Sequence, residues 1–222
     1  NTVALRMFDY HIGVSDAMVQ LLISRGFDPQ KLFSIYNGVE FPPKPARLSR
    51  AEYLGSLGIT FDADTVVFGI AARLNPVKDI ATLIRGFAGA CRTCPNIRLI
   101  IAGDGEERQM LEELAKEVCP EGSVVFAGWV KDTDSFYNAI DVNMLTSLSE
   151  GSPYALVEGA RMRCATIATA VGGIPYMMES GVTGLLFTPR DVDTLTAYMV
   201  RLVQNPAFRK QLGQNFYEKA ER

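Results

Sequence analysis

Two cations, Arg73 and Lys78, lie five residues apart in a segment that joins a predicted strand to a predicted helix. The planar guanidinium group of an arginine can hold two phosphate oxygens at once, and a lysine near the start of a helix adds a compact positive charge. The pair therefore suits a pyrophosphate group. Because exposed charges are common on protein surfaces, the pair equally fits two solvated surface cations, and this segment alone does not decide between them.

Two glutamates, Glu150 and Glu158, lie eight residues apart in the most specific motif of the chain. Ser152 is a good N-cap residue and Pro153 a favoured first helical residue, so the sequence predicts Glu150 in a loop and Glu158 on the second helical turn. The two carboxylates can then have different tasks. The backbone amides at this helix start point, with the positive end of the helix dipole, toward any anion in the cleft. The helix start comprises Gly151, Ser152, Pro153 and Tyr154.

Three further loops carry glycine or an aromatic residue after a predicted strand. Gly103 begins a Gly-Asp-Gly sequence that lets backbone approach a ligand, but Arg108 stands where a dinucleotide-binding fingerprint needs its third glycine. Trp129 and Val130 follow the next strand, and the tryptophan fits either contact with a base or packing at the edge of the core. A glycine pair at 172–173 fits a tight turn without any ligand.

Short apolar runs alternate with segments of helical periodicity from residue 65 onward. Strands separated by helices indicate βαβ crossovers, so the sequence predicts the α/β class with a Rossmann-like, doubly wound parallel sheet. Ligands of such sheets bind at the carboxyl ends of the strands, and the loops described above should therefore meet there. The predicted strands are 66–71, 97–102, 123–127, 142–145, 165–168 and 184–187, and the predicted helices are 79–91, 106–118, 133–139, 153–163, 192–203 and 207–220.

The first part of the chain does not show the regular alternation of strands and helices that begins at residue 65. Ser15 is a good N-cap for a helix, and an apolar run at 32–36 predicts a strand that meets Asn37-Gly38, a pair suited to positive φ in a tight turn. The Pro-rich stretch 41–47 marks a boundary. The chain is accordingly divided into a segment at 1–45 and a Rossmann-like domain at 46–222.

Composition narrows the classes of function. The chain has 22 Lys and Arg against 25 Asp and Glu, a net charge of −3 without a basic stripe, so nucleic acid is not the expected partner. No run approaches the roughly 20 apolar residues of a membrane span, and the first residues lack a signal pattern. The chain has one Cys-x-x-Cys pair, at 91–94, without a second such pair, and its sequence contains a single histidine, His11. These ligand counts disfavour zinc or redox work. We expect a packing or surface role for His11, and the few, unevenly spaced cysteines indicate a reducing, cytoplasmic location.

Taken in order, these motifs resemble the C-terminal domain of retaining glycosyltransferases of the GT-B fold, the group called family 4 or group 1. The resemblance covers almost the whole chain, from the Val-Ser-Asp sequence at 14–16 to the glycine pair at 172–173. It implies that 1–45 is an interdomain segment and that 46–222 binds a nucleotide sugar. Tyr176 departs from the family, which often has glutamate there, and Arg-Cys-Ala-Thr at 163–166 replaces the usual entry to a strand.

The resemblance implies a role for each motif. Arg73 and Lys78 would hold the donor diphosphate and neutralise the leaving nucleotide as the glycosidic bond breaks. Glu150 would contact sugar hydroxyls, which makes it the third expected catalytic residue. Glu158 would accept hydrogen bonds from the ribose, the backbone at 129–130 would meet the base, and the amides at the predicted helix start would complete the phosphate cradle.

No cofactor or metal is expected, since the resemblance implies that the substrate itself is a nucleotide diphosphate sugar, for which we expect the UDP or GDP type. Asp-x-Asp sequences begin at Asp62, Asp132 and Asp191, and this pattern holds manganese in the other large transferase fold. Aspartate is favoured in turns and at helix caps, so we interpret these three as turn and cap residues.

The resemblance also implies a partner half. A complete GT-B enzyme has an N-terminal domain that binds the acceptor, here a glycan, a lipid or a small molecule, and the sequence contains no such domain. The chain by itself is then an inactive donor-binding fragment, with an apolar patch on the helix after Val14 and on the C-terminal helices. The alternative is a non-catalytic nucleotide-sugar-binding subunit that pairs with a separate acceptor-binding chain. Epimerases of nucleotide sugars and glycan phosphorylases share the GT-B architecture, so a different reaction on the same fold is a third possibility. For the location of the protein, peripheral contact with the inner membrane face is also compatible with the resemblance.

Overall fold

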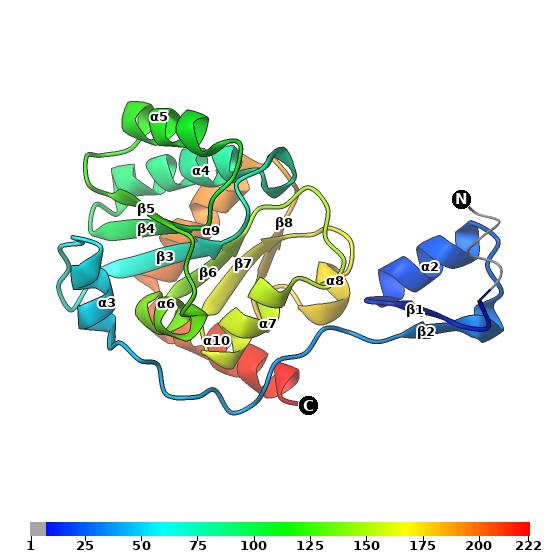
Figure 1. Ribbon diagram of the computed structural model, residues 1–222. Helices are drawn as coiled ribbons and strands as arrows, with labels where there is room; N and C mark the ends of the chain where they lie inside the picture. Colours follow the sequence, from blue (N-terminus) through cyan, green and yellow to red (C-terminus); the bar gives the residue numbers. More distant parts are fainter. Residues whose placement is uncertain (1–7) are drawn as a thin grey trace.

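The computed structural model describes residues 8–222 and contains a sheet of six parallel strands (Figure 1). The order across the sheet is β5-β4-β3-β6-β7-β8, so the chain winds outward from β3 in one direction and then outward from β6 in the other. This order confirms the predicted doubly wound α/β fold and places its reversal point between β3 and β6. The strands are β3 (Val66–Ala71), β4 (Ile97–Ala102), β5 (Val124–Gly128), β6 (Val142–Leu145), β7 (Ala165–Thr169) and β8 (Leu185–Phe187).

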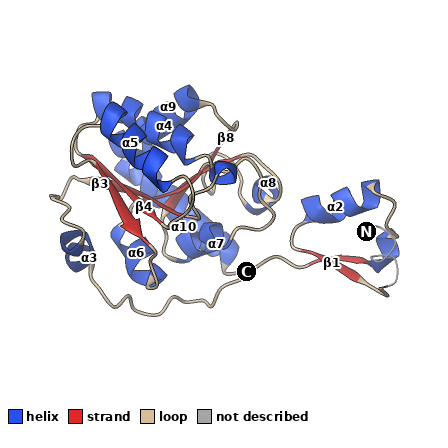
Figure 2. Cartoon of the chain, turned by 45° about the horizontal axis from the view of Figure 1, so that its top comes forward, coloured by secondary structure: helices blue, strands red, loops and turns tan. Residues whose placement is uncertain are grey.

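Helices cover both faces of this sheet, as Figures 1 and 2 show. On one face lie α4 (Ile80–Thr93), α5 (Arg108–Val118) and α9 (Val192–Gln204). On the other face lie α3 (Arg50–Ser56), α6 (Thr133–Ala139) and α7 (Tyr154–Arg161). The short α8 (Ile174–Met177) follows β7, and α10 (Pro206–Ala220) packs beside α7 and β7. Within residues 8–222, no helix is long and apolar enough to cross a bilayer.

Alternate side chains of each strand enter different cores. Phe68 of β3 and Leu99 of β4 are fully buried in the cluster that includes α4 and α9. Val67 and Ile100, their neighbours along the same strands, are fully buried in the cluster on the α3 and α6 face. A strand with apolar residues on both faces is typical of a parallel sheet covered on both sides. This pattern explains why continuous apolar runs predicted these strands well.

The N-terminal unit is a single parallel βαβ element beside the main domain (Figure 1). It comprises β1 (His11–Gly13), α2 (Asp16–Ser24) and β2 (Leu32–Ser34), with β1 and β2 paired in parallel. The Ser15 side chain accepts a hydrogen bond from the Met18 amide at 3.3 Å, which confirms the predicted N-cap. His11 packs edge-to-face on Phe27 with 5.0 Å between ring centroids, which fits the expected packing role.

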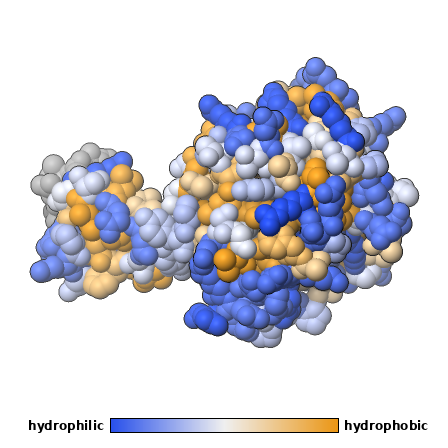
Figure 3. Space-filling view, turned by 180° about the vertical axis from the view of Figure 1, so that it is seen from behind, coloured by the Kyte–Doolittle hydropathy of each residue, from blue (hydrophilic) through white to orange (hydrophobic). Residues whose placement is uncertain are grey.

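Apolar side chains are exposed on this unit, and Figure 3 shows them on the N-terminal part of the surface. Ile12 and Phe33 are register partners on β1 and β2, and their side chains are 63% and 49% exposed. The helix after Val14 is likewise not buried. The expected apolar patch is wrong for the C-terminal helices, because α9 and α10 bury Met199 and Leu212 in the main core.

Several elements begin or end where the sequence did not place them. The strand predicted at 32–36 ends at Ser34, and β1 and α3 were not predicted. Helix α7 begins at Tyr154, because Pro153 keeps the extended ψ of 125° and occupies the N-cap position predicted for Ser152. Asn37 and Gly38 do not have the positive φ that was expected of a tight turn. Helix α3 begins with a capping box between Ser49 and Glu52. The Arg50 guanidinium then joins its first turn to Ala139, Thr65 and Asp141.

The cysteines serve the core. Cys91 and Cys94 are buried at the end of α4, and all four cysteines are free thiols. Burial raises the pKa of the Cys91 thiol to about 12, so it stays protonated and unreactive at neutral pH. This placement gives the Cys-x-x-Cys pair a packing role in the core.

Loops at the carboxyl edge of the sheet pack backbone against backbone. Gly103 has a φ of +132°, its amide donates to the Gly128 carbonyl at 2.7 Å, and a Cβ atom at this position would overlap the Ala72 carbonyl oxygen. The glycine is therefore needed for the approach of a neighbouring loop of the same chain. A ligand is not required to explain it.

We expect Gly103→Ala to lower the free energy of unfolding by about 3 kcal/mol or more, because it adds both a steric overlap and a backbone penalty at positive φ. Gly55→Ala in α3 is the matched control, since open space surrounds that position. The control should raise the free energy of unfolding by about 0.5–1 kcal/mol. Urea unfolding followed by circular dichroism measures both, and a Gly103→Ala variant as stable as wild type would contradict this account.

Candidate functional site

The candidate site lies at the reversal point of the sheet, where the loop after β3 meets the loop after β6. Two hydrogen bonds join these loops: the Thr146 hydroxyl donates to the Lys78 carbonyl at 2.8 Å, and the Leu148 amide donates to the Val77 carbonyl at 2.8 Å. Ligands of doubly wound sheets bind at this point because the diverging loops leave a crevice there. The structure therefore places Lys78 and Glu150 together at this reversal point.

Lys78 and Glu150 form an ion pair across this reversal point. The Lys78 Nζ lies 2.6 Å from Glu150 Oε1, and the Ser147 hydroxyl donates to the same oxygen at 2.6 Å. The two charged side chains are only 26% and 11% exposed. An ammonium group has three protons and this contact uses one, so two are left for further acceptors. Partial burial argues against a merely solvated surface cation at Lys78.

Arg73 is held more loosely. Its guanidinium lies 3.3 Å from Glu106, and the two side chains are 71% and 54% exposed. Exposed ion pairs contribute about 0–1 kcal/mol, because water screens them and both side chains lose conformational freedom. The Arg73 guanidinium can therefore exchange its carboxylate partner for a phosphate at little cost.

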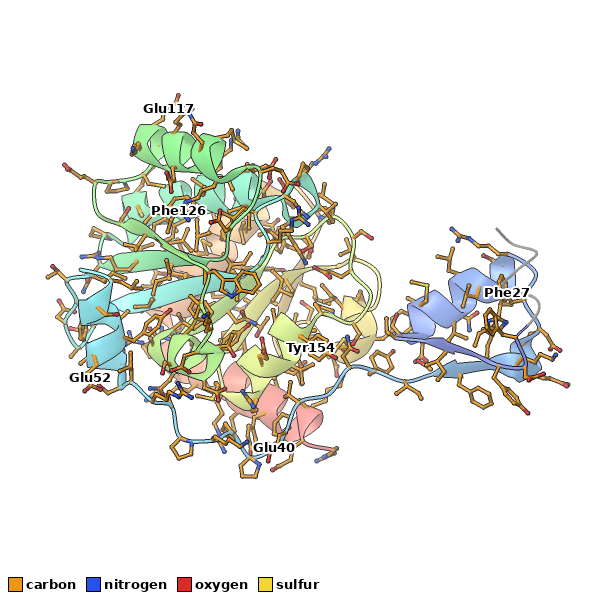
Figure 4. The ribbon with its side chains drawn as sticks, in the orientation of Figure 1. Phe27, Glu40, Glu52, Glu117, Phe126 and Tyr154 are labelled. Atoms are coloured by element: carbon orange, nitrogen blue, oxygen red, sulfur yellow. The ribbon has the colours of Figure 1, made fainter. Side chains whose placement is uncertain are left out.

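The start of α7 supplies unpaired amides beside this ion pair. Among the described residues, none accepts a hydrogen bond from the backbone amides of Gly151, Ser152 or Tyr154. The first amides of a helix lack intrahelical partners and attract anions. Tyr154, at the beginning of α7 in Figure 4, is 56% exposed. Pro153 has no amide proton and contributes only the bend that begins the helix.

Ser152 takes part through its backbone only. Its side chain is buried, accepts a hydrogen bond from the Asn37 amide at 3.2 Å and lies 3.7 Å from the Met177 sulfur. The Ser152 hydroxyl is thus occupied within the protein, and the predicted capping role is wrong. The glycine pair at 172–173 lies behind the same loop, where the Gly173 amide donates to the Glu150 carbonyl at 3.3 Å.

Glu158 lies away from this ion pair, on the side of α7 that faces α6. Burial raises the pKa of its carboxyl, while the Tyr137 hydroxyl and the Arg161 guanidinium lower it in part. Arg161 is itself paired with Asp134 of α6. The structure therefore separates the two glutamates as the sequence predicted, with Glu150 in the loop and Glu158 on the helix.

A cavity of about 260 Å³ lies at the ends of β3, β4 and β5. Trp129 at its rim is 76% exposed, so it does not close the edge of the core. The cavity brings Gly103, Trp129 and Val130 next to Arg73, and mostly apolar residues form it. They are Ala71, Ala72, Arg73, Ala102, Gly103, Trp129, Val130, Thr133 and Phe136. A larger hollow of about 690 Å³ beside α5 and β5 contains none of the predicted site residues.

The first aspartate of each of the three Asp-x-Asp sequences stabilises a helix start or a turn. Asp132 and Asp191 accept hydrogen bonds from the amides of Ser135 and Thr194 and cap α6 and α9. Asp62 accepts from the Asp64 amide within a turn. These contacts agree with the turn and cap roles that the sequence predicted.

Sequence reasoning missed three residues that shape the site. Ser147 and Glu106 hold Glu150 and Arg73, and Asn37 holds Ser152 from the far end of the chain. The position of Ser147 three residues before Glu150 was a usable signal. Neither the Arg73–Glu106 pair nor the Asn37–Ser152 contact, 115 residues apart, leaves a local pattern.

Comparisons with known proteins agree with this architecture. Residues 59–219 match the family described as "Glycosyl transferases group 1". The chain is 30% identical over 156 residues to the lipopolysaccharide core biosynthesis glycosyltransferase LpsE of Rhizobium meliloti, covering 70% of this chain and 45% of LpsE. The chain thus spans about half the length of such relatives.

Two solved structures share the fold. HepE of Anabaena, in complex with UDP and glucose, superposes with a TM-score of 0.85 at 23% identity, over 96% of this chain and 58% of HepE. The C-terminal domain of the group 1 family protein LpcC from Francisella tularensis gives 0.72 at 22% identity, over 83% of this chain and 97% of that domain. The second structure is of a C-terminal domain by itself.

We expect Glu158→Gln to stabilise the chain by a margin that grows with pH. The raised pKa means that ionising Glu158 costs folding free energy, and this cost appears as pH rises through the unfolded pKa of about 4.3 toward the folded value. Urea unfolding at pH 4 and at pH 7 measures the margin, with the exposed Glu117→Gln on α5 as control. An equal margin at both pH values would contradict a raised pKa of Glu158 in the folded chain.

Proposed function

Because the chain belongs to the glycosyl transferases of group 1, we propose that it binds the nucleotide diphosphate sugar donor of a retaining family 4 glycosyltransferase. The observation that carries this proposal is the part-buried Lys78–Glu150 pair at the reversal point, beside the free amides at the start of α7. A cation and unpaired amides at one crevice suit a diphosphate.

In this proposal the diphosphate lies among Lys78, Arg73 and the amides of Gly151, Ser152 and Tyr154. Negative charge grows on the diphosphate as the bond to the sugar breaks, and preorganised cations and amides stabilise that charge most in the transition state. Lys78 is held by Glu150, and Glu150 is itself held by the Ser147 hydroxyl, before any ligand arrives. Little reorganisation is therefore needed during the reaction.

The base and ribose occupy the side of the site toward α6. The cavity with Trp129, Val130 and Gly103 is mostly apolar and also includes Arg73, which suits a base next to its phosphates. Glu158, on the α7 side, is the acceptor for ribose hydroxyls. We propose UDP as the first candidate nucleotide, with GDP second, because the HepE structure contains UDP.

Sugar recognition falls to Glu150. Its contacts to Lys78 and Ser147 both involve Oε1, so within the described residues Oε2 is left for a sugar hydroxyl. The retaining outcome follows from the motif resemblance, and the anomeric configuration of the product, read by NMR, tests it.

The acceptor site belongs to another half of the enzyme. Relatives such as LpsE are about twice as long as the matched region, which favours one longer chain over a separate acceptor-binding subunit. We propose a glycan or lipid acceptor and a cytoplasmic reaction at the inner membrane face, since LpsE is described as acting in lipopolysaccharide core biosynthesis.

We expect Lys78→Ala to weaken UDP binding about tenfold to a hundredfold, because it removes a charge-assisted contact of about 1.5–3 kcal/mol. Arg73→Ala together with Lys78→Ala should abolish the stabilisation by UDP, which is about 2.7 kcal/mol at 100 times the dissociation constant. Calorimetric titration and thermal unfolding measure these effects, and the exposed Lys210→Ala on α10 is the control. Unchanged UDP affinity in the double variant would refute the donor site.

A further inference from the structure

The loop that carries the proposed phosphate-binding amides is held by Asn37, which follows β2, and by the residues just before α2. The Asn37 side-chain amide donates to the Ser152 carbonyl at 2.6 Å, and the Asn37 backbone amide donates to the Ser152 hydroxyl at 3.2 Å. Ser152 is 5% exposed, so water does not compete freely for these bonds. Asn37, on the linker between β2 and α3 (residues 35–49), thus holds both the carbonyl and the hydroxyl of Ser152.

The beginning of α2 packs on the same loop. A Cβ atom on Gly151 would lie 3.0 Å from a methyl group of Val14, and one on Gly173 would lie 2.8 Å from the Cβ of Ser15. The Gly173 amide also donates to the Glu150 carbonyl. The 150–152 backbone is therefore enclosed between the start of α2 and the glycine pair at 172–173.

The two contacts from the N-terminal unit act together. The Asp16 amide at the start of α2 donates to the Tyr36 hydroxyl at 3.1 Å, which ties α2 to the residue before Asn37. Figure 4 shows the linker passing the start of α7, where Tyr154 is labelled. A displacement of this unit would therefore move the contacts at Ser152 and Gly151 together.

We propose that Asn37 is a positioning residue for the donor phosphates, and that it couples the β1–α2–β2 unit to donor binding. This inference rests on the proposed function. Holding the carbonyl and the hydroxyl of Ser152 restricts its backbone, so that the amides of Gly151 and Ser152 keep one direction without a ligand. Preorganised donors bind an anion more tightly because less ordering is needed on binding. Coupling of this kind is reciprocal, so the donor also tightens the unit against the main domain.

The test compares Asn37→Ala with Asn138→Ala in the 222-residue chain. Asn138 is the matched control, because its side-chain amide also donates to a linker carbonyl, that of Leu48 at 3.3 Å, but away from the site. Asn37→Leu is the second variant, which keeps the approximate size and branching of the side chain and removes its amide donor without adding a charge. Two readouts are used: hydrogen exchange of the peptide 149–156, and the dissociation constant of UDP.

Both Asn37 variants should accelerate exchange of 149–156 and weaken UDP binding about tenfold, as expected for one lost hydrogen bond to a buried group. Exchange at 124–132 should stay unchanged, and Asn138→Ala should behave as wild type in both readouts. If the role of Asn37 were purely structural, its variants would lower the free energy of unfolding without a local increase in exchange at 149–156. If wild type binds UDP and the Asn37 variants bind it equally, the inference is overturned while the donor site stands. If wild type binds none of UDP, GDP, ADP or CDP, the proposed function and this inference both fail.

Discussion

Four loops leave the sheet at the carboxyl ends of β3, β4, β6 and β7, and their backbones lie so close that side chains cannot fit between them. A Cβ atom at Gly103 would overlap the loop after β3, and one at Gly172 would overlap the Glu150 carbonyl. Steric exclusion of this kind fixes the backbone positions from which the side chains of Arg73, Lys78 and Glu150 extend. The polar contacts of the site are small adjustments on a geometry that backbone packing has already determined.

The cations of the site differ in how tightly the protein holds them. Lys78 is part-buried and its partner Glu150 is only 11% exposed, whereas Arg73 and Glu106 are mostly in solvent. A part-buried charge that loses its partner is costly, so Glu150 can release Lys78 only when another anion replaces it. Arg73 has no such constraint and can move to a ligand freely. The site thus combines one fixed cation with one adaptable cation.

Sequence patterns predicted the elements that bury apolar residues on a regular period. The strands 66–71, 97–102 and 142–145 match residue for residue, because both of their faces are buried. Helix starts were predicted less well, since Pro153 was compatible with both the N-cap and the first helical position. The N-terminal strand was missed because three residues carry too little periodicity. Asn37 was interpreted as a turn residue, because its real partner lies 115 residues away and no local signal identifies a contact of that range.

Glu150 links the phosphate and sugar ends of the proposed donor site. One of its oxygens holds both Lys78 and Ser147, so its orientation depends on the ion pair. A diphosphate that accepts from the other Lys78 protons weakens the contact to Glu150 without moving Lys78, so that the Glu150 carboxylate gains from further donors. In the proposed site, sugar hydroxyls are the donors that a nucleotide sugar would bring to this position. A nucleotide without a sugar therefore leaves a part-buried carboxylate less well satisfied than the complete donor does, which favours binding of the substrate over binding of the nucleotide product.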